Sequence, residues 1–360
     1  MNYRHAFHAG NFADVFKHAA FALIIEYLKR KAAPFAVVDT HAGLGRYDLA
    51  AAEAERTGEW REGIGRVLES SERPPGIASL LKAVAAVNGG KKPSAASPPR
   101  WYPGSPRIAR TLIRNRDRLW CAELHPDDAR VLAREFRGDS QVVVRHMDGY
   151  EAIRAWLPPQ PPRANPRGES MEAAGNPLLA RLPAGPPPRR GVVLVDPPFE
   201  QRDEFRYLLK GLKDGHRRFA TGIFVLWYPI KGLAPVGAFH QALAQSGLRR
   251  ILAAELLLRP PGGAGRPNKK PGAENAAGSL GIGAFAPGDP ARPDRGASSD
   301  ARGDSPARLQ GCGLIVVNPP WRLDSDLAEL VAGLRTVFSA TVEGANRRGE
   351  VPAVRWLVGE

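Results

Sequence analysis

The sequence predicts an α/β fold built on a doubly wound, mostly parallel β-sheet. Short apolar runs rich in β-branched residues recur along the 360 residues, and such runs suit strands that are covered on both faces. Segments with apolar residues at helical spacing lie between these runs, and alternating strands and helices are typical of parallel sheets. Hydrophobic residues make up 43% of the chain, which is enough for a large core.

The order of these segments predicts the domain organisation. The runs with strand character are 35–39, 119–124, 142–146, 191–196, 222–228, 251–258, 313–318 and 353–358. Helical spacing is found at 12–31, 126–137, 200–213 and 324–338. Helical pieces at 48–100 interrupt the alternation, so we expect a small inserted helical subdomain there. Residues 1–47 would then hold an N-terminal motif, a helix and the first strand, and 101–360 the remainder of the same domain.

Two segments differ in composition from the rest. Residues 158–190 contain 10 prolines, and residues 259–310 contain 8 prolines and 10 glycines. Proline removes backbone donors and disfavours both helix and central strand. We therefore expect 158–190 and 259–310 to be flexible inserts.

The charge and the cysteine content restrict the class of protein. Lys and Arg exceed Asp and Glu by 51 − 37 = 14, which favours an anionic partner such as nucleic acid. The two inserts carry about 6 of these charges, so about 8 belong to the folded part. Two cysteines cannot form a disulfide framework, and we see no secretory signal and no membrane-spanning apolar stretch. We expect a cytoplasmic protein that does not associate with membranes.

Three strand ends suggest a nucleoside-cofactor pocket. The first strand runs into Gly43 and Gly45, where the backbone can approach a ligand closely, although both are also ordinary turn residues. Glu123 ends the second strand, where a carboxylate can accept bonds from two ribose hydroxyls or simply be solvated. Asp148-Gly149 follows the third strand, at a position suited to an adenine amino group or to a plain turn.

The most specific motif is Asp196-Pro197-Pro198-Phe199 after the fourth strand. The exocyclic nitrogen of a planar base is a poor nucleophile, because its lone pair is delocalised into the ring. The Asp196 carboxylate and the Pro197 carbonyl can accept its two hydrogens, which directs the lone pair at a methyl donor. Phe199 offers a stacking face for a flipped-out base. The motif therefore predicts amino-group methylation, with a proline-stiffened turn as the plain alternative.

A second run, Asn318-Pro319-Pro320-Trp321, fits the same general pattern. It follows the seventh strand, usually an antiparallel strand near the sheet edge, whereas Asp196 ends a strand beside the first. We therefore interpret Asn318–Trp321 as structural.

Histidines are concentrated near the N-terminus, but no further ligands at zinc spacing accompany them, so we expect no metal site. His18 and His41 are expected to line the cofactor pocket, unless they are core histidines satisfied by the backbone.

The chain resembles the RlmJ family in motifs that cover nearly all of it outside the two inserts. These motifs are Tyr3–Asn11, Ala13–Val15, Lys17–His18, Asp39–Gly43, Glu55–Glu59, Tyr102–Pro106, Glu123–Pro126, Asp148–Gly149, Asp196–Pro198, Arg218–Gly222, Leu226–Pro229 and Asn318–Trp321. The resemblance implies a class I S-adenosylmethionine-dependent methyltransferase with a Rossmann-like, seven-stranded, mostly parallel sheet and a small helical insertion. It further implies methylation of N6 of one adenine in 23S ribosomal RNA.

The resemblance also implies roles for individual residues. Asp196, Pro197 and Phe199 would be catalytic, although the family carries Tyr where this chain has Phe199. The residues implied to contact S-adenosylmethionine are His18, His41, Gly43, Ser105, Glu123, Asp148, Gly149 and Asp196. Tyr3, Arg4 and Lys17 would meet the substrate RNA, and the insertion at 48–100 would help to hold it. The expected partner is naked 23S ribosomal RNA or an early assembly intermediate, bound by a monomer.

Other functions stay open at this stage. A DNA adenine-N6 methyltransferase would use the same chemistry, and a non-catalytic, basic RNA-binding or ribosome-assembly protein would share the charge. A protein-glutamine methyltransferase is a more distant alternative, because that class prefers Asn at the position of Asp196.

Overall fold

The computed structural model describes residues 5–159, 188–201, 203–258, 309–339 and 352–359. Within these residues the main sheet has eight strands in the order β10-β8-β9-β7-β6-β1-β4-β5. The strands are β1 (Ala36–Asp39), β4 (Arg118–Glu123), β5 (Val142–His146), β6 (Gly191–Val195), β7 (Ile223–Ile230), β8 (Ile251–Leu257), β9 (Gly311–Val317) and β10 (Val354–Val358). The mixed α/β class is confirmed, and the sheet has one strand more than the seven expected.

Strands β5, β4, β1, β6 and β7 form a continuous parallel block. Strand β9 runs antiparallel between β7 and β8, and β10 pairs antiparallel with β8 at the sheet edge. The additional strand is therefore β10. The five parallel strands end at one edge of the sheet, which we call the carboxyl edge, and they begin at the opposite amino edge.

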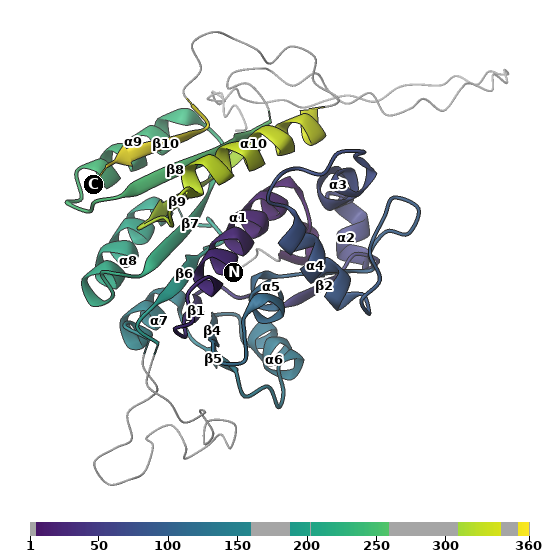
Figure 1. Ribbon diagram of the computed structural model, residues 1–360, viewed down its shortest axis with the longest axis horizontal. Helices are drawn as coiled ribbons and strands as arrows, with labels where there is room; N and C mark the ends of the chain where they lie inside the picture. The colour runs from purple at the N-terminus through teal and green to yellow at the C-terminus, as the bar shows by residue number, and fades with distance from the viewer. Residues whose placement is uncertain (1–4, 160–187, 202, 259–308, 340–351, 360) are drawn as a thin grey trace, which may run out of the picture.

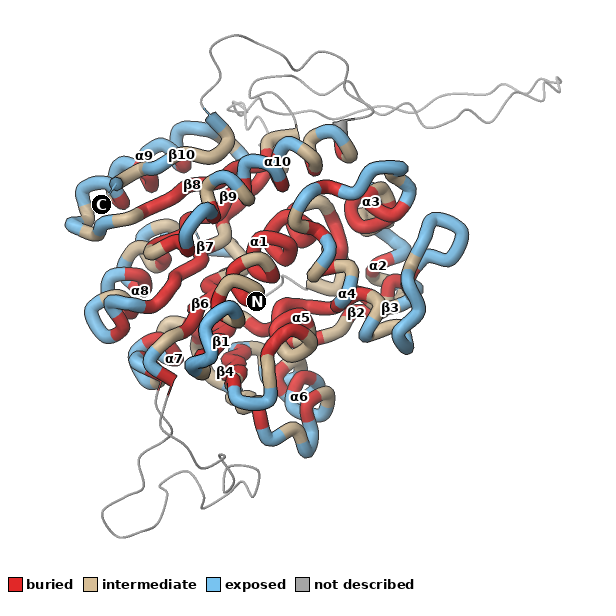
Figure 2. The backbone as a smooth tube through the Cα atoms, in the orientation of Figure 1, coloured by how far each residue is buried: buried red, intermediate tan, exposed pale blue. Residues whose placement is uncertain are grey.

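Helices cover both faces of the sheet (Figure 1). One face packs against α1 (Phe12–Lys29), α5 (Ser105–Leu112), α6 (Pro126–Glu135) and α10 (Leu323–Ser339). The other packs against α7 (Gly149–Trp156), α8 (Glu204–Arg218) and α9 (Leu233–Ala244). Figure 2 shows the strands and the inner helix surfaces as the buried part of the chain. The helices predicted at 12–31, 126–137, 200–213 and 324–338 correspond to α1, α6, α8 and α10.

The segment between the first two strands of the main sheet forms short helices and a small two-stranded sheet. Its elements are β2 (Arg46–Asp48), α2 (Ala52–Thr57), a π-helical turn at Arg61–Gly65, α3 (Arg66–Glu69), α4 (Ala78–Val87) and β3 (Trp101–Pro103). Ile64, Leu80 and Val84 from this segment are fully buried in the core cluster that also contains α1. The limits of 48–100 as a separate subdomain stay a prediction, and the inserts expected at 158–190 and 259–310 lie almost wholly outside the described residues.

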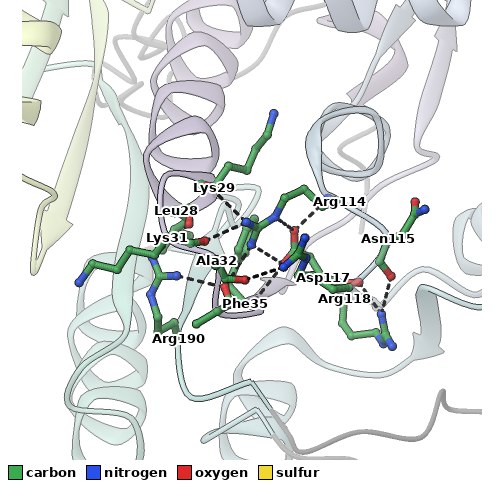
Figure 3. A network of polar contacts seen from close by, with 12 residues as sticks. Leu28, Lys29, Lys31, Ala32, Phe35, Arg114, Asn115, Asp117, Arg118 and Arg190 are labelled. Carbon is green, nitrogen blue, oxygen red and sulfur yellow. Dashed lines mark hydrogen bonds and ion pairs between the residues drawn. The ribbon is translucent and has the colours of Figure 1, made fainter.

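Helix α1 crosses the sheet from one edge to the other, and polar contacts fix both of its ends. The Asn11 side chain accepts from the Asp14 amide (3.0 Å) and caps the N-terminus. At the amino edge, the Arg114 guanidinium donates to the Lys29 carbonyl (3.1 Å) and pairs with buried Asp117 (2.8 Å), as Figure 3 shows. Arg190 donates to the Leu28 carbonyl (3.1 Å). Eighteen helical residues span about 27 Å at 1.5 Å each, so α1 carries its first turns to the carboxyl edge.

Candidate active site

The strand register brings three acidic residues to the carboxyl edge of the sheet. Strand β1 lies between β4 and β6, so the end of β1 at Asp39 is next to the ends of both neighbours. Glu123 is the last residue of β4, and Asp196 follows the last residue of β6. This edge, where parallel strands stop and loops begin, is where ligands bind in open α/β sheets.

Helix α1 delivers Lys17 to Asp196. The Lys17 ammonium nitrogen lies 2.5 Å from Asp196 Oδ2 and 2.9 Å from Asp14 Oδ1. The Lys17 side chain is only 4% exposed and that of Asp196 14% exposed. Burial alone would lower the pKa of Lys17, but the two carboxylates raise it above its ordinary value. The buried ammonium group of Lys17 thus fixes the position of the Asp196 carboxylate. The Asp196 side chain remains partly exposed to solvent.

Asp14 anchors this pair from inside the protein. Its Oδ2 atom accepts from the Gly10 amide (3.0 Å) and lies 2.9 Å from His5 Nε2. Burial opposes ionisation of Asp14, but His5 and Lys17 outweigh it and hold the pKa of this carboxyl well below its usual range. Sequence reasoning did not assign Asp14 to the site, because an acid in the first turn of a helix also has a purely helical explanation.

Asp39 is the second site residue that sequence reasoning missed. It is fully buried, and its Oδ2 atom has no hydrogen-bond partner of ordinary geometry among the described residues. Burial raises the pKa of Asp39 to about 7, and the Asp196 charge adds to the effect, whereas the nearby Ser105 hydroxyl opposes it. A buried polar atom without a partner, beside Ser105 and Asp196, is a position where a bound ligand can supply a donor.

The glycine loop is bound to Glu123. The Gly43 amide donates to Glu123 Oε2 (2.7 Å), and the His125 amide donates to Oε1 (2.8 Å). Gly43 has φ +60, and a Cβ there would lie 2.2 Å from the Tyr47 hydroxyl. Only glycine suits this position, whereas the close approach of this loop to a ligand stays a prediction. Each Glu123 oxygen retains a lone pair for a further donor.

Asp148 and Gly149 form the start of α7. Asp148 Oδ1 accepts from the Tyr150 and Glu151 amides (both 2.9 Å), so Asp148 is the N-cap and its second oxygen is not needed for capping. A Cβ on Gly149 would lie 2.3 Å from the Thr40 carbonyl oxygen and 2.7 Å from His41 Cε1. The end of β5 is therefore in direct contact with the loop after β1.

The two predicted pocket histidines are neutral. Burial lowers the pKa of His18 to about 3 and that of His41 to about 4. His18 Nδ1 lies 3.0 Å from the Tyr102 hydroxyl, and His41 Nδ1 lies 2.8 Å from Thr40 Oγ1. Both are thus hydrogen-bonded at the carboxyl edge, His18 from helix α1 and His41 from the loop after β1.

Phe199 adopts a left-handed backbone conformation, with φ +52, in the loop after Asp196. Its ring packs edge-on against Phe205 (5.1 Å between centroids) and Trp227 (5.8 Å). Trp227 also has the Lys17 ammonium 5.8 Å from its ring centroid. This aromatic group borders the Lys17–Asp196 pair, and Trp227 is a third site residue that the sequence did not single out.

The residues expected to meet RNA are placed differently from one another. Tyr3 and Arg4 lie outside the described residues. Lys17 is inside the site rather than on its surface, because its ammonium group is bonded to Asp14 and Asp196. A direct contact of Lys17 with a phosphate at the surface is therefore not supported.

Asn318 lies at the amino edge, away from Asp196. Strand β9 runs antiparallel to β7, with Val317 paired to Phe224 near the start of β7. The Asn318 amide donates to the carbonyls of Ala220 (2.8 Å) and Gly222 (2.9 Å). This position agrees with the structural role expected for Asn318–Trp321.

The donor and acceptor set at the carboxyl edge fits S-adenosylmethionine. Glu123 and Asp148 each offer an acceptor to the nucleoside part, and Asp39 offers a buried acceptor near the opposite end of the site. Among the described residues, no group of three or more His, Cys, Asp and Glu side chains could hold a metal ion. In the same residues, no helix is both long and apolar enough to span a membrane.

Comparison with known proteins identifies the family. A family model described as "Ribosomal RNA large subunit methyltransferase D, RlmJ" matches residues 32–165 and 171–268, which is more than half of the chain. The chain belongs to the RlmJ family. Its fold is therefore that of a class I methyltransferase, as the resemblance predicted, and the family model is that of a ribosomal RNA methyltransferase.

Two relatives cover this RlmJ family member almost completely. Ribosomal RNA large subunit methyltransferase J of Escherichia coli (strain K12) is 34% identical over 360 residues, 100% of both chains. The protein of the same name from Haemophilus influenzae is 34% identical over 331 residues, 92% of each chain. A crystal structure of a Legionella pneumophila protein superposes with a TM-score of 0.66 at 25% identity, over 93% of this chain and 95% of that one.

Proposed function

We propose that this protein transfers a methyl group from S-adenosylmethionine to the exocyclic N6 of a specific adenine in 23S ribosomal RNA. The observation that carries the proposal is the Asp196 carboxylate, held by Lys17 at the carboxyl edge and followed by the Pro197 carbonyl. Family membership supports the ribosomal RNA, and the motif supports an amino group as the acceptor.

The main contribution of the protein to this reaction is to position the amine and the methyl donor. When bound, S-adenosylmethionine supplies an electrophilic methyl group on a sulfonium. Asp196 and the Pro197 carbonyl accept the two N6 hydrogens, which localises the nitrogen lone pair and directs it at that methyl group. Nitrogen gains the methyl group and loses one proton, for which the Asp196 carboxylate is the acceptor. Lys17 pairs with Asp196 and fixes its orientation.

The base must leave its helix to reach Asp196. Phe199 and Trp227 form the aromatic border against which a flipped adenine would stack. Phe199 has no hydroxyl, so its contribution is limited to stacking. Tyr3, Arg4 and the 48–100 segment would hold the surrounding RNA, which is naked 23S ribosomal RNA or an early assembly intermediate bound by a monomer.

The cofactor positions follow from the same geometry. Glu123 accepts from the ribose, and Asp148 with Gly149 receives the adenine of the cofactor. His18, His41, Gly43 and Ser105 would line the remainder of that pocket.

The test is methyl transfer by Asp196→Ala, with Glu329→Ala, which removes an exposed carboxylate of α10, as the control. We expect loss of labelled-methyl incorporation into naked large-subunit RNA with Asp196→Ala and retention with Glu329→Ala. Full activity of Asp196→Ala would refute the mechanism. Incorporation into DNA instead of ribosomal RNA would favour a DNA adenine-N6 methyltransferase. RNA binding without calorimetric binding of S-adenosylmethionine would favour a non-catalytic protein.

A further inference from the structure

The two edges of the sheet carry opposite charge. The carboxyl edge gathers Asp14, Asp39, Glu123, Asp148 and Asp196, with Lys17 paired to two of them and Lys231 exposed after β7. The segments at the amino edge contribute exposed cations from several strands. These are Lys31 before β1, Arg116 before β4, Arg189 before β6, Arg218 before β7 and Arg322 after the antiparallel β9. We call these five residues the amino-edge band.

In the described part of the chain, no ion pair joins a residue of the amino-edge band to a carboxylate. Asp117 is buried and bonded to Arg114, and Asp214 is bonded to Arg217 (2.6 Å). Asp324 and Asp326 follow Arg322 in the first turn of α10, but neither side chain is paired with it. Within the band, Arg116 donates to the Ala32 carbonyl (3.1 Å), which orients its guanidinium without neutralising it. Figure 3 shows this part of the amino edge.

An exposed tryptophan stands at one end of the amino-edge band. Trp321 is 76% exposed, more than any other large hydrophobic side chain in the described part of the chain. The loop that presents it is fixed by three contacts: Asn318 to the Ala220 carbonyl, the Asn318 amide N–H to the Arg250 carbonyl (3.0 Å), and the Arg250 guanidinium to the Pro319 carbonyl (3.2 Å).

Backbone strain is concentrated in this loop and in the turn before β8 that contacts it. Arg250, Asn318 and Arg322 all have positive φ (+54, +54 and +66), and Phe199 in the active site is the other non-glycine residue of this kind in the described chain. Non-glycine residues in this conformation cost energy and cluster at functional sites. Folding alone does not explain why this constrained loop leaves the large Trp321 indole exposed.

From these observations we propose that the amino-edge band and Trp321 form a second RNA-binding surface, separate from the catalytic edge, which takes phosphates on its arginines and an unpaired base on the indole. An arginine row with an exposed aromatic ring is the chemistry of single-stranded nucleic-acid binding. The inference rests on the proposed function, because the RNA is the substrate RNA. The acidic catalytic edge suits a neutral base better than phosphates, so a surface at the amino edge would add to the contacts that Tyr3, Arg4 and the 48–100 segment make around the base.

The test compares a triple variant, Arg189→Gln with Arg218→Gln and Arg322→Gln, with a matched triple on the α7 and α8 surfaces, Arg154→Gln with Arg206→Gln and Lys210→Gln. The dissociation constant for a naked large-subunit RNA transcript is measured over a series of salt concentrations. We expect the first triple to reduce the slope of log affinity against log salt by about 2 to 3, and the control triple to leave it unchanged. Trp321→Ala alone should weaken binding about 5- to 100-fold.

Turnover at saturating RNA and calorimetric binding of S-adenosylmethionine should be unchanged in the first triple, because the band is remote from Asp196. Equal affinities and salt slopes for wild type and the first triple would overturn the proposal, as would an equal loss in the control triple. A failure of the proposed function would give another result. Wild-type protein would still bind the RNA, and the band would contribute to that binding, but the protein would not methylate the RNA.

Discussion

Lys17 on α1 and Asp196 after β6 are 179 positions apart in the chain, yet their charged groups lie 2.5 Å apart at the carboxyl edge of the sheet. The contact exists because α1 crosses the whole sheet and is fixed at both ends. Arg114 and Arg190 bind its last carbonyls at the amino edge, and Asn11 caps its first turn. The orientation of the Asp196 carboxylate therefore depends on the position of a helix that precedes every strand of the sheet.

The first prediction concerns the loss of this cation. Lys17→Met removes the partner of two buried carboxylates, Asp14 and Asp196, and should cost about 3–5 kcal/mol in the free energy of unfolding. Urea unfolding measures the loss, and methyl transfer should fall with it. Lys29→Met is the matched control on the same helix, because Lys29 pairs with partly exposed Glu26 and should cost under about 1 kcal/mol. A similar cost for both variants would contradict the role of Lys17.

The second prediction concerns Glu123. Both of its oxygens accept backbone N–H groups, so the amide of Glu123→Gln would have to point its NH₂ at the amide of Gly43 or of His125. We expect a loss of about 1–3 kcal/mol in loop stability, and a roughly 10- to 100-fold weaker binding of S-adenosylmethionine by calorimetry. Glu329→Gln, on the exposed surface of α10, should change neither quantity. Unchanged cofactor affinity in Glu123→Gln would exclude Glu123 as a cofactor ligand.

The sequence predicted the parts of this site that follow strand ends, and it missed the parts that come from long-range packing. Glu123, Asp148 and Asp196 each end a recognisable apolar run, so the parallel topology alone puts them at one edge. In the sequence, Asp14 is an ordinary acidic residue in the first turn of a helix, and Asp39 is an ordinary acidic residue at the end of a strand. Only the contact of α1 with the loop after β6 makes Asp14 part of the site, and only the burial of β1 leaves Asp39 Oδ2 without a hydrogen-bond partner among the described residues.

The fold also contains elements that the sequence predicted and elements that it missed. Runs of β-branched residues identified the strands, including β10, whose addition to the sheet depends on pairing with β8. The sequence did not predict helix α9, because Pro235 and Gly237 lie within it. It did not predict α5 either, because that helix is short and begins with Ser-Pro. Tertiary packing overrides weak local propensity in such cases.

The third prediction is a pH dependence. The pKa of Asp39 is raised to about 7 by burial, whereas in the unfolded chain it is near 3.9. The native state therefore holds a proton that the unfolded state has released, and stability falls as the pH rises from about 4 to 7, with no further change above 7. Asp39→Asn should flatten this dependence and gain about 2–3 kcal/mol relative to wild type between pH 5 and pH 8. Urea unfolding at both pH values measures it, and parallel profiles for the two proteins would show that Asp39 ionises normally.

The fourth prediction tests the contact between the β5 and β1 ends. A Cβ added at Gly149 would lie 2.3 Å from the Thr40 carbonyl oxygen, a backbone atom that cannot move without displacing the His41 loop. Gly149→Ala should therefore destabilise the protein by about 1–3 kcal/mol and weaken S-adenosylmethionine binding, because the two loops that border the cofactor would be forced apart. Gly237→Ala is the control, since Gly237 lies in α9 with nothing within 4 Å of an added Cβ. That change should stabilise the helix by about 0.5–1 kcal/mol. If Gly149→Ala unfolds at the same urea concentration as wild type and binds the cofactor equally well, the loops are not in the direct contact described here.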